Sequence, residues 1–158
     1  MDLPNRKLPR LTDFDYSSEN YYFVTICTKD KKCIFGKPNE LNSIGRIAEQ
    51  ELLSVSGHYD RIAVEKYIIM PNHIHAVIRF GCDGAEQASL FPTLSTLVGG
   101  YKSGAARKIH RLSPGLDVWQ KSFYDTIIRN ERAYLEICKY IDENPIKWES
   151  DEYYSVSR

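Results

Sequence analysis

Two of the four histidines in this chain, His73 and His75, lie within the strongly apolar stretch IIMPNHIHAVIRF, residues 68–80. A β-strand turns successive side chains to opposite faces, so both imidazoles should point one way while Ile74 points the other. Neutral imidazole is a good ligand for first-row divalent ions, and a rigid strand fixes the angle between two such ligands. The pair is therefore half of a candidate metal site. The alternative is a structural role for both histidines.

A second candidate group lies in the stretch NERAYLEICKYIDENP, residues 130–145, which has helical spacing. Its apolar stripe consists of Tyr134, Ile137, Cys138 and Ile141. Tyr140 and Asn144 are i and i+4, so they are neighbours on one flank of that stripe. A tyrosine hydroxyl there could attack phosphorus, and the Asn144 oxygen could be a third ligand to the ion held by the histidines. The alternative is an aromatic packing residue followed by an asparagine ahead of a helix-ending proline.

The composition is that of one globular domain. The chain has 158 residues, of which 42% are hydrophobic and 12% aromatic, and this is ample for one core. Basic and acidic residues both total 21, so a nucleic acid would need a segregated basic surface. The sequence has no apolar run of roughly 18 residues, no signal-peptide core and no CxxC spacing among its cysteines. We therefore expect a cytoplasmic protein without a membrane partner.

Periodicity predicts the elements that must position these groups. Strands are predicted at 21–28, 61–70, 73–80 and 118–124, and helices at 42–57, 94–112 and 130–144. The helix 94–112 contains three glycines, each of which costs up to about 1 kcal/mol against alanine. The first twenty residues are expected to form a basic arm, and residues 146–158 a polar, peripheral tail.

The order strand, helix, strand, strand, helix, strand, helix predicts an α+β, ferredoxin-like split βαβ fold. In this fold an antiparallel sheet carries helices on one face, and here a C-terminal helix that would be catalytic is added. We expect a single domain over residues 1–158, with the other face of the sheet free for a site.

Four segments, YYFVTICT, MPNHIHAVI, VWQKSFYDTIIRNE and KYIDENPIKW, span nearly the whole chain. Their order and spacing resemble those of the REP-associated tyrosine transposases, single-tyrosine transposases of the HUH superfamily, where HUH means His, hydrophobic residue, His. The resemblance implies that His73 and His75 are the metal-binding pair. It implies that the nucleophile is Tyr140, which is followed by the family pattern I-x-x-N-P. Asn144 would be the third ligand, where many relatives have glutamine.

The resemblance also implies a mechanism of the HUH endonuclease type. The cofactor would be a divalent ion, Mg²⁺ or Mn²⁺, with open positions for phosphate and water. Attack by Tyr140 would give a 5′-phosphotyrosine and a free 3′-hydroxyl, and the same site could rejoin another 3′ end. Tyr124 and Tyr134 lack the downstream pattern, so we assign them to packing or DNA contact. The predicted function is a DNA transposase that nicks and rejoins single-stranded DNA at palindromic hairpins.

The predicted partner is accordingly single-stranded or hairpin DNA, and the family includes homodimers as well as monomers. Between Ala88 and Leu116 the chain has no acidic residue, which makes that region a candidate DNA-binding surface. The candidate DNA-binding residues are Lys102, Arg107, Lys108 and Arg111, with Arg6, Lys7 and Arg10 of the arm as a second set.

A different class of protein remains as the runner-up. It is a non-catalytic, domesticated protein that binds single-stranded DNA or RNA hairpins on the same kind of sheet. In that case the two histidines would be structural or would stack on bases. A metal phosphohydrolase is disfavoured because the sequence has no cluster of carboxylates suited to a second ion.

Overall fold

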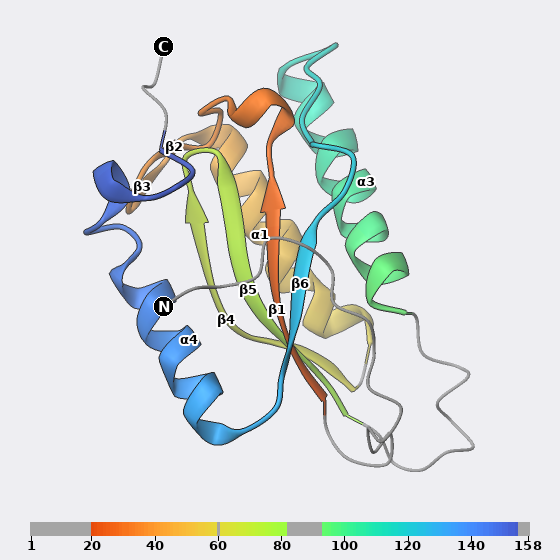
Figure 1. The fold of residues 1–158 in the computed structure, drawn as a ribbon. Coiled ribbons are helices and arrows are strands. Elements are labelled where there is room, and N and C mark those ends of the chain that lie inside the picture. Colours follow the sequence, from red (N-terminus) through yellow and green to blue (C-terminus); the bar gives the residue numbers. More distant parts are fainter. Residues whose placement is uncertain (1–19, 60, 82–92, 155–158) are drawn as a thin grey trace.

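The computed structural model describes residues 20–59, 61–81 and 93–154 (Figure 1). At its centre is a four-stranded antiparallel sheet with the strand order β4-β5-β1-β6. The strands of this sheet are β1 (Asn20–Cys27), β4 (Ile62–Met70), β5 (His73–Phe80) and β6 (Tyr124–Ile128). The α-helices are α1 (Ser43–His58), α3 (Leu94–Leu112) and α4 (Glu131–Glu143). Short elements are the 3-10 helices η1 (Lys29–Lys31) and η2 (Trp148–Ser150) and the strands β2 (Gly36–Lys37) and β3 (Glu40–Leu41).

The helices divide between the two faces of the sheet (Figure 1). The larger hydrophobic core lies under α1 and α3 and includes Ile74 of β5. A smaller core lies under α4, where Ile137 and Ile141 pack with Phe23 and Val77 on the opposite face. The element order and this antiparallel sheet confirm the predicted ferredoxin-like α+β fold with an additional C-terminal helix.

Side-chain caps explain where the helices begin. Asn42 accepts a hydrogen bond from the backbone nitrogen of Gly45, Thr93 from that of Thr96, and Asn130 from that of Ala133. Such caps satisfy one of the backbone N–H groups that the first turn of a helix leaves without a partner. The three predicted helices are confirmed with bounds that agree within one or two residues.

The last strand of the sheet begins later in the chain than the sequence predicted. Residues 118–124 were expected to form it, but β6 is Tyr124–Ile128. Val118 is buried in the larger core instead, and Trp119 donates from Nε1 to the carbonyl of Lys102. Trp119 also forms an isolated antiparallel bridge with Thr28, just after β1, but the regular strand begins only at Tyr124, which pairs with Thr25 of β1.

The described part of the C-terminal tail is not peripheral. We call residues 145–154 the C-terminal segment. Its Tyr153 is buried, and the carbonyl of Tyr153 accepts a hydrogen bond from Asn72 Nδ2 at 2.7 Å. The polar composition of the tail gave no indication of this contact, which brings the segment over one face of the sheet.

The basic arm, with Arg6, Lys7 and Arg10, lies outside the described residues. Within the described ranges, no helix combines the length and the apolar character needed to cross a membrane.

Candidate active site

The two histidines lie at the start of β5 and face α4, whereas Ile74 between them belongs to the larger core on the opposite face. Their side chains are 0% and 1% exposed, and the ring centroids are 4.6 Å apart. In the strand register His73 lies opposite Cys27 and His75 opposite Thr25. The structure therefore brings both imidazoles to one face, as the spacing predicted.

Both imidazoles are held through Nδ1. Nδ1 of His73 lies 2.8 Å from Oδ1 of Asn72, and Nδ1 of His75 lies 2.8 Å from Oγ1 of Thr25. The Nε2 atoms of the two histidines and Oδ1 of Asn144 are buried without a well-formed hydrogen bond to any described residue. Buried polar atoms without a partner cost about 1–3 kcal/mol each, so these three atoms are candidates for binding a ligand.

Helix α4 brings the other two predicted residues to the histidines. The ring centroid of Tyr140 lies 5.3 Å from that of His75 and 6.1 Å from that of Phe23. Asn144 is 3% exposed and keeps helical dihedral angles, φ −55° and ψ −47°, although a proline follows it. Its Nδ2 donates to the carbonyl of Tyr140 at 2.7 Å, which leaves Oδ1 available for a different partner.

Burial sets the protonation of these groups. It lowers the pKa of His73 well below the ordinary value; the neighbouring His75 lowers it further, and the Asn144 amide opposes the shift. Burial also lowers the pKa of His75 to about 3. Burial raises the pKa of Tyr140 to about 12; Asp151 adds to this shift, and the Asn144 amide opposes it. At neutral pH the imidazoles are therefore neutral, the form that binds metal ions, and the phenol keeps its proton.

These residues fit the divalent ion that the sequence resemblance implies. In the described part of the chain, no group of three or more His, Cys, Asp or Glu side chains is placed to hold a metal ion. The candidate donor set is instead His73, His75 and the amide oxygen of Asn144. Two imidazoles and one amide oxygen leave further coordination positions open, as Mg²⁺ and Mn²⁺ require for binding phosphate and water.

The C-terminal segment covers this site with aromatic rings. The ring centroid of Tyr153 lies 4.5 Å from that of His73, and that of Trp148 lies 6.1 Å from it. The Nζ atom of Lys31 lies 5.3 Å from the centroid of the Tyr153 ring. Both histidines are also buried, so the C-terminal segment and α4 together separate them from solvent in this structure.

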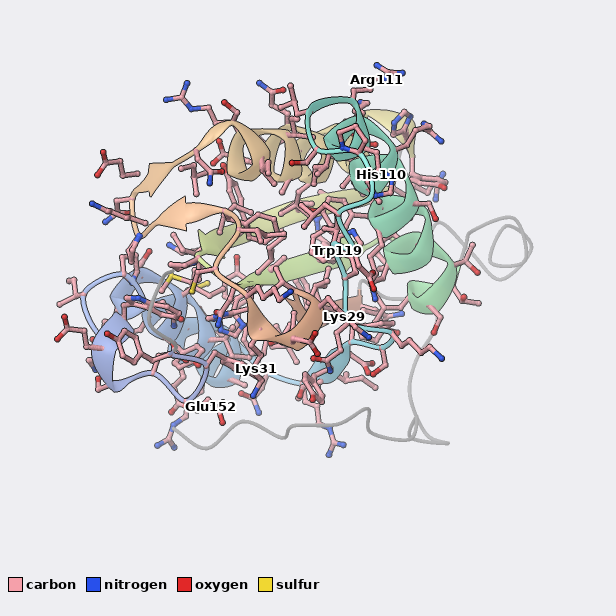
Figure 2. The ribbon with its side chains drawn as sticks, turned by 90° about the horizontal axis from the view of Figure 1, so that it is seen from above. Lys29, Lys31, His110, Arg111, Trp119 and Glu152 are labelled. Atoms are coloured by element: carbon pink, nitrogen blue, oxygen red, sulfur yellow. The ribbon has the colours of Figure 1, made fainter. Side chains whose placement is uncertain are left out.

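The candidate DNA-binding residues of α3 are not beside the histidines, because α3 packs on the opposite face of the sheet. Lys102 donates to the carbonyls of Gln120 and Ser122, and Lys108 forms an ion pair with Glu51 at 2.6 Å. Arg107 and Arg111 are exposed. Figure 2, which looks onto the end of the sheet, shows Arg111 near α3 and far from Lys31 and Glu152. DNA contact by the α3 cations is not tested by these contacts, but their place across the sheet from the histidines makes them less suited to bind a phosphate at the candidate site.

Other residues near the site were missed from the sequence. Lys31 is close enough for its charge to influence the pKa of His73, and the exposed Lys32 follows it. The run KDKK directly after the first predicted strand was the available signal for this pair. Thr25 had no such signal, since only the strand register places it opposite His75.

No family model matches the chain. Solved structures with the same fold include the following two. A REP-associated tyrosine transposase bound to a REP hairpin is 14% identical with a TM-score of 0.55, and the match covers 89% of this chain and 74% of that one. A proposed transposase from Deinococcus radiodurans R1 is 15% identical with a TM-score of 0.55, over 86% of this chain and 97% of that one. The fold is thus that of the REP-associated tyrosine transposases.

A protein with a similar sequence occurs in Haemophilus influenzae. This uncharacterized protein is 32% identical over 168 residues, which cover 95% of the present chain and 93% of the relative. The chain belongs to the same family as the Haemophilus influenzae protein.

Proposed function

We propose that this protein is a metal-dependent DNA transposase that nicks and rejoins single-stranded DNA at palindromic hairpins through a 5′-phosphotyrosine on Tyr140. The observation that carries the proposal is the set of three buried donor atoms, His73 Nε2, His75 Nε2 and Asn144 Oδ1. They lie on a strand and a helix that also bring a tyrosine against the histidines. The fold shared with a hairpin-bound transposase supports hairpin DNA as the partner.

Two rigid elements would divide the work. His73 and His75 on β5 and Asn144 at the end of α4 would hold a Mg²⁺ or Mn²⁺ ion. When bound, such an ion polarises a non-bridging phosphate oxygen and stabilises the charge that develops during attack. The Asn144 side chain is tied to the carbonyl of Tyr140, so the third ligand and the nucleophile move as one unit.

The reaction balances without an external energy source. The Oη atom of Tyr140 forms a bond to phosphorus, the bond to the 3′ oxygen breaks, and this oxygen leaves as a hydroxyl with a proton. The phenol gives up its proton, and burial, which raises the pKa of Tyr140 to about 12, makes this loss unfavourable while the site is closed. Another 3′-hydroxyl can then attack the phosphotyrosine, which restores the phenol and joins the two DNA strands.

A denaturing gel assay for a covalent adduct tests the proposal. Wild-type protein and Tyr140→Phe are each mixed with a labelled library of single-stranded hairpins and Mn²⁺ or Mg²⁺. We expect a metal-dependent adduct with wild type and none with Tyr140→Phe, which should still bind hairpins. Tyr134→Phe, on the same helix, is the matched control and should form the adduct. Nicking by Tyr140→Phe would show that another group is the nucleophile.

A non-catalytic hairpin-binding protein is the second candidate function. The observation in its favour is the closure of the site, since the histidines are 0% and 1% exposed and Tyr153 covers one of them. Hairpin binding by wild type without an adduct in either metal would favour this candidate.

A further inference from the structure

Asn72 occupies the turn between β4 and β5 and is 0% exposed. Its Nδ2 donates to the carbonyl of Tyr153 at 2.7 Å and to the carbonyl of Lys31 at 3.1 Å. Its Oδ1 lies 2.8 Å from Nδ1 of His73. Its own carbonyl accepts hydrogen bonds from the backbone nitrogen of Thr28 at 3.0 Å and from the hydroxyl of Thr28 at 3.1 Å. Both its backbone and its side chain are therefore fixed.

These partners determine which way the amide faces. A carbonyl oxygen only accepts hydrogen bonds, so the contacts to Lys31 and Tyr153 both require the NH₂ group of Asn72. The amide oxygen must then face His73. Because an amide oxygen also only accepts, Nδ1 of His73 has to carry the proton of this hydrogen bond. The lone pair is left on Nε2, the buried atom without a well-formed hydrogen bond to a described residue.

We propose that Asn72 is the positioning residue of the metal site, which holds His73 as the Nδ1–H tautomer with the Nε2 lone pair directed at the ion. The ion as ligand rests on the proposed function, whereas the tautomer of His73 does not. Groups that hold the second nitrogen of a metal-binding histidine typically contribute 10- to 100-fold in metal affinity. Asn72 thus has a role in the site although it touches neither DNA nor metal.

The backbone around Asn72 supports this role. Asp30 and Lys31 in η1 both have a φ of 55°, a left-handed conformation that is uncommon for residues other than glycine. The hydrogen bond from Asn72 to the carbonyl of Lys31 holds this strained segment in place. One side chain therefore links η1, the C-terminal segment and the candidate metal ligand His73.

The decisive measurement is the imidazole ¹⁵N spectrum of the metal-free protein at slightly alkaline pH. We expect His73 to carry its proton on Nδ1 in wild type. Asn72→Asp keeps an acceptor for that proton and cannot donate to the two carbonyls, so it should preserve the tautomer. Asn72→Ala removes the acceptor and should give a mixture of tautomers. Thr25→Val is the matched control, since it should alter the signals of His75 and leave those of His73 unchanged.

Mn²⁺ titration of the same proteins gives the second readout. Asn72→Ala should bind Mn²⁺ about 10- to 100-fold more weakly than wild type, and Asn72→Asp should recover most of this loss. A proton on Nε2 of His73 in wild type would overturn the inference, and so would unchanged Mn²⁺ affinity in a folded Asn72→Ala. If Asn72→Ala does not fold, the inference is tested by the tautomer of His73 in wild type and in Asn72→Asp. If the His73 tautomer and the Mn²⁺ affinities are as expected but no DNA adduct forms, the proposed function is rejected and the inference about Asn72 stands.

Discussion

The three donor atoms of the candidate site are unusual for a protein interior. Nε2 of His73, Nε2 of His75 and Oδ1 of Asn144 are all buried without a well-formed hydrogen bond to a described residue. Each such atom destabilises the native state by about 1–3 kcal/mol unless something binds it. A ligand that binds only the folded protein would reverse part of this loss.

Metal binding should therefore raise the melting temperature. At a free Mn²⁺ concentration of about 100 times Kd, linkage gives about 2.7 kcal/mol of stabilisation, or roughly 5–10 °C in Tm for a chain of this size. A chelator should reverse the shift. His75→Ala should show no shift, whereas His58→Ala, at an exposed position on α1, should behave as wild type does. Calorimetry measures these melting temperatures. An equal Mn²⁺-induced rise in the Tm of His75→Ala would mean that the ion binds elsewhere.

The sequence supported His73, His75, Tyr140 and Asn144 because helix and strand periods place residues two or four apart on one side. The structure brings these four together. Asn72 and Thr25 could not be assigned in this way, since the role of each depends on tertiary contacts. Thr25 meets His75 through strand register alone, and Asn72 is fixed by carbonyls 41 and 81 residues away along the chain.

At the scale of elements, the helices followed the sequence better than the strands did. The α3 helix has the predicted bounds despite its glycines, because Thr93 caps it and Leu97, Val98, Tyr101 and Ala105 are buried along one side. The segment 118–124 has the composition of a strand, yet it pairs with the end of β1 through one isolated bridge, between Trp119 and Thr28, and hydrogen bonds with Lys102 hold it beside α3. Composition could not distinguish strand pairing from packing against a helix.

Two helical glycines should respond in opposite ways to alanine. A Cβ atom at Gly45 would lie 2.2 Å from the carbonyl oxygen of Phe35, whereas one at Gly100 would have nothing within 4 Å. Gly45→Ala should lower the free energy of unfolding by about 1–3 kcal/mol. Gly100→Ala should raise it by up to about 1 kcal/mol through helix propensity. Urea denaturation measures both, and stabilisation by Gly45→Ala would contradict the close packing of α1 on Phe35.

At the scale of the whole molecule, a chain with no net charge would have to gather its cations on one surface in order to bind DNA. The α3 cations predicted from the sequence lie across the sheet from the histidines, and two of them are held by other residues. Figure 2 shows Lys29 and Lys31 on the side of the molecule away from Arg111, and the Nζ atom of Lys31 lies 5.3 Å from the centroid of the Tyr153 ring, which covers His73. The structure thus shifts our expectation for phosphate contacts from α3 toward η1.

Salt dependence of hairpin binding separates the two surfaces. For single-stranded DNA, each lost phosphate contact reduces the slope of log K against log salt by roughly 0.7. Lys31→Ala combined with Lys32→Ala should therefore reduce the magnitude of this slope by roughly 1.4. Arg107→Ala combined with Arg111→Ala is the matched pair on α3 and should change it little. The reverse outcome, measured by fluorescence anisotropy, would restore the assignment to α3.

Hydrogen exchange should be faster in α4 than in α1 or α3. The α4 helix buries only Ile137 and Ile141, and it packs on the smaller of the two cores. Asn130→Ala removes its cap and should cost about 1 kcal/mol, which corresponds to roughly fivefold faster exchange of its amides. Asn42→Ala removes the equivalent cap from α1 and should leave α4 unchanged. Equal protection of all three helices would contradict a separate opening of α4.

Because α4 packs on the smaller core, we expect this helix to open as a cooperative unit of its own. Such a sub-global opening would carry Tyr140 and Asn144 away together, because both belong to the helix and its C-cap, while His73 and His75 stay in a sheet stabilised by the larger core. The site could then come apart and re-form many times during the lifetime of one folded molecule.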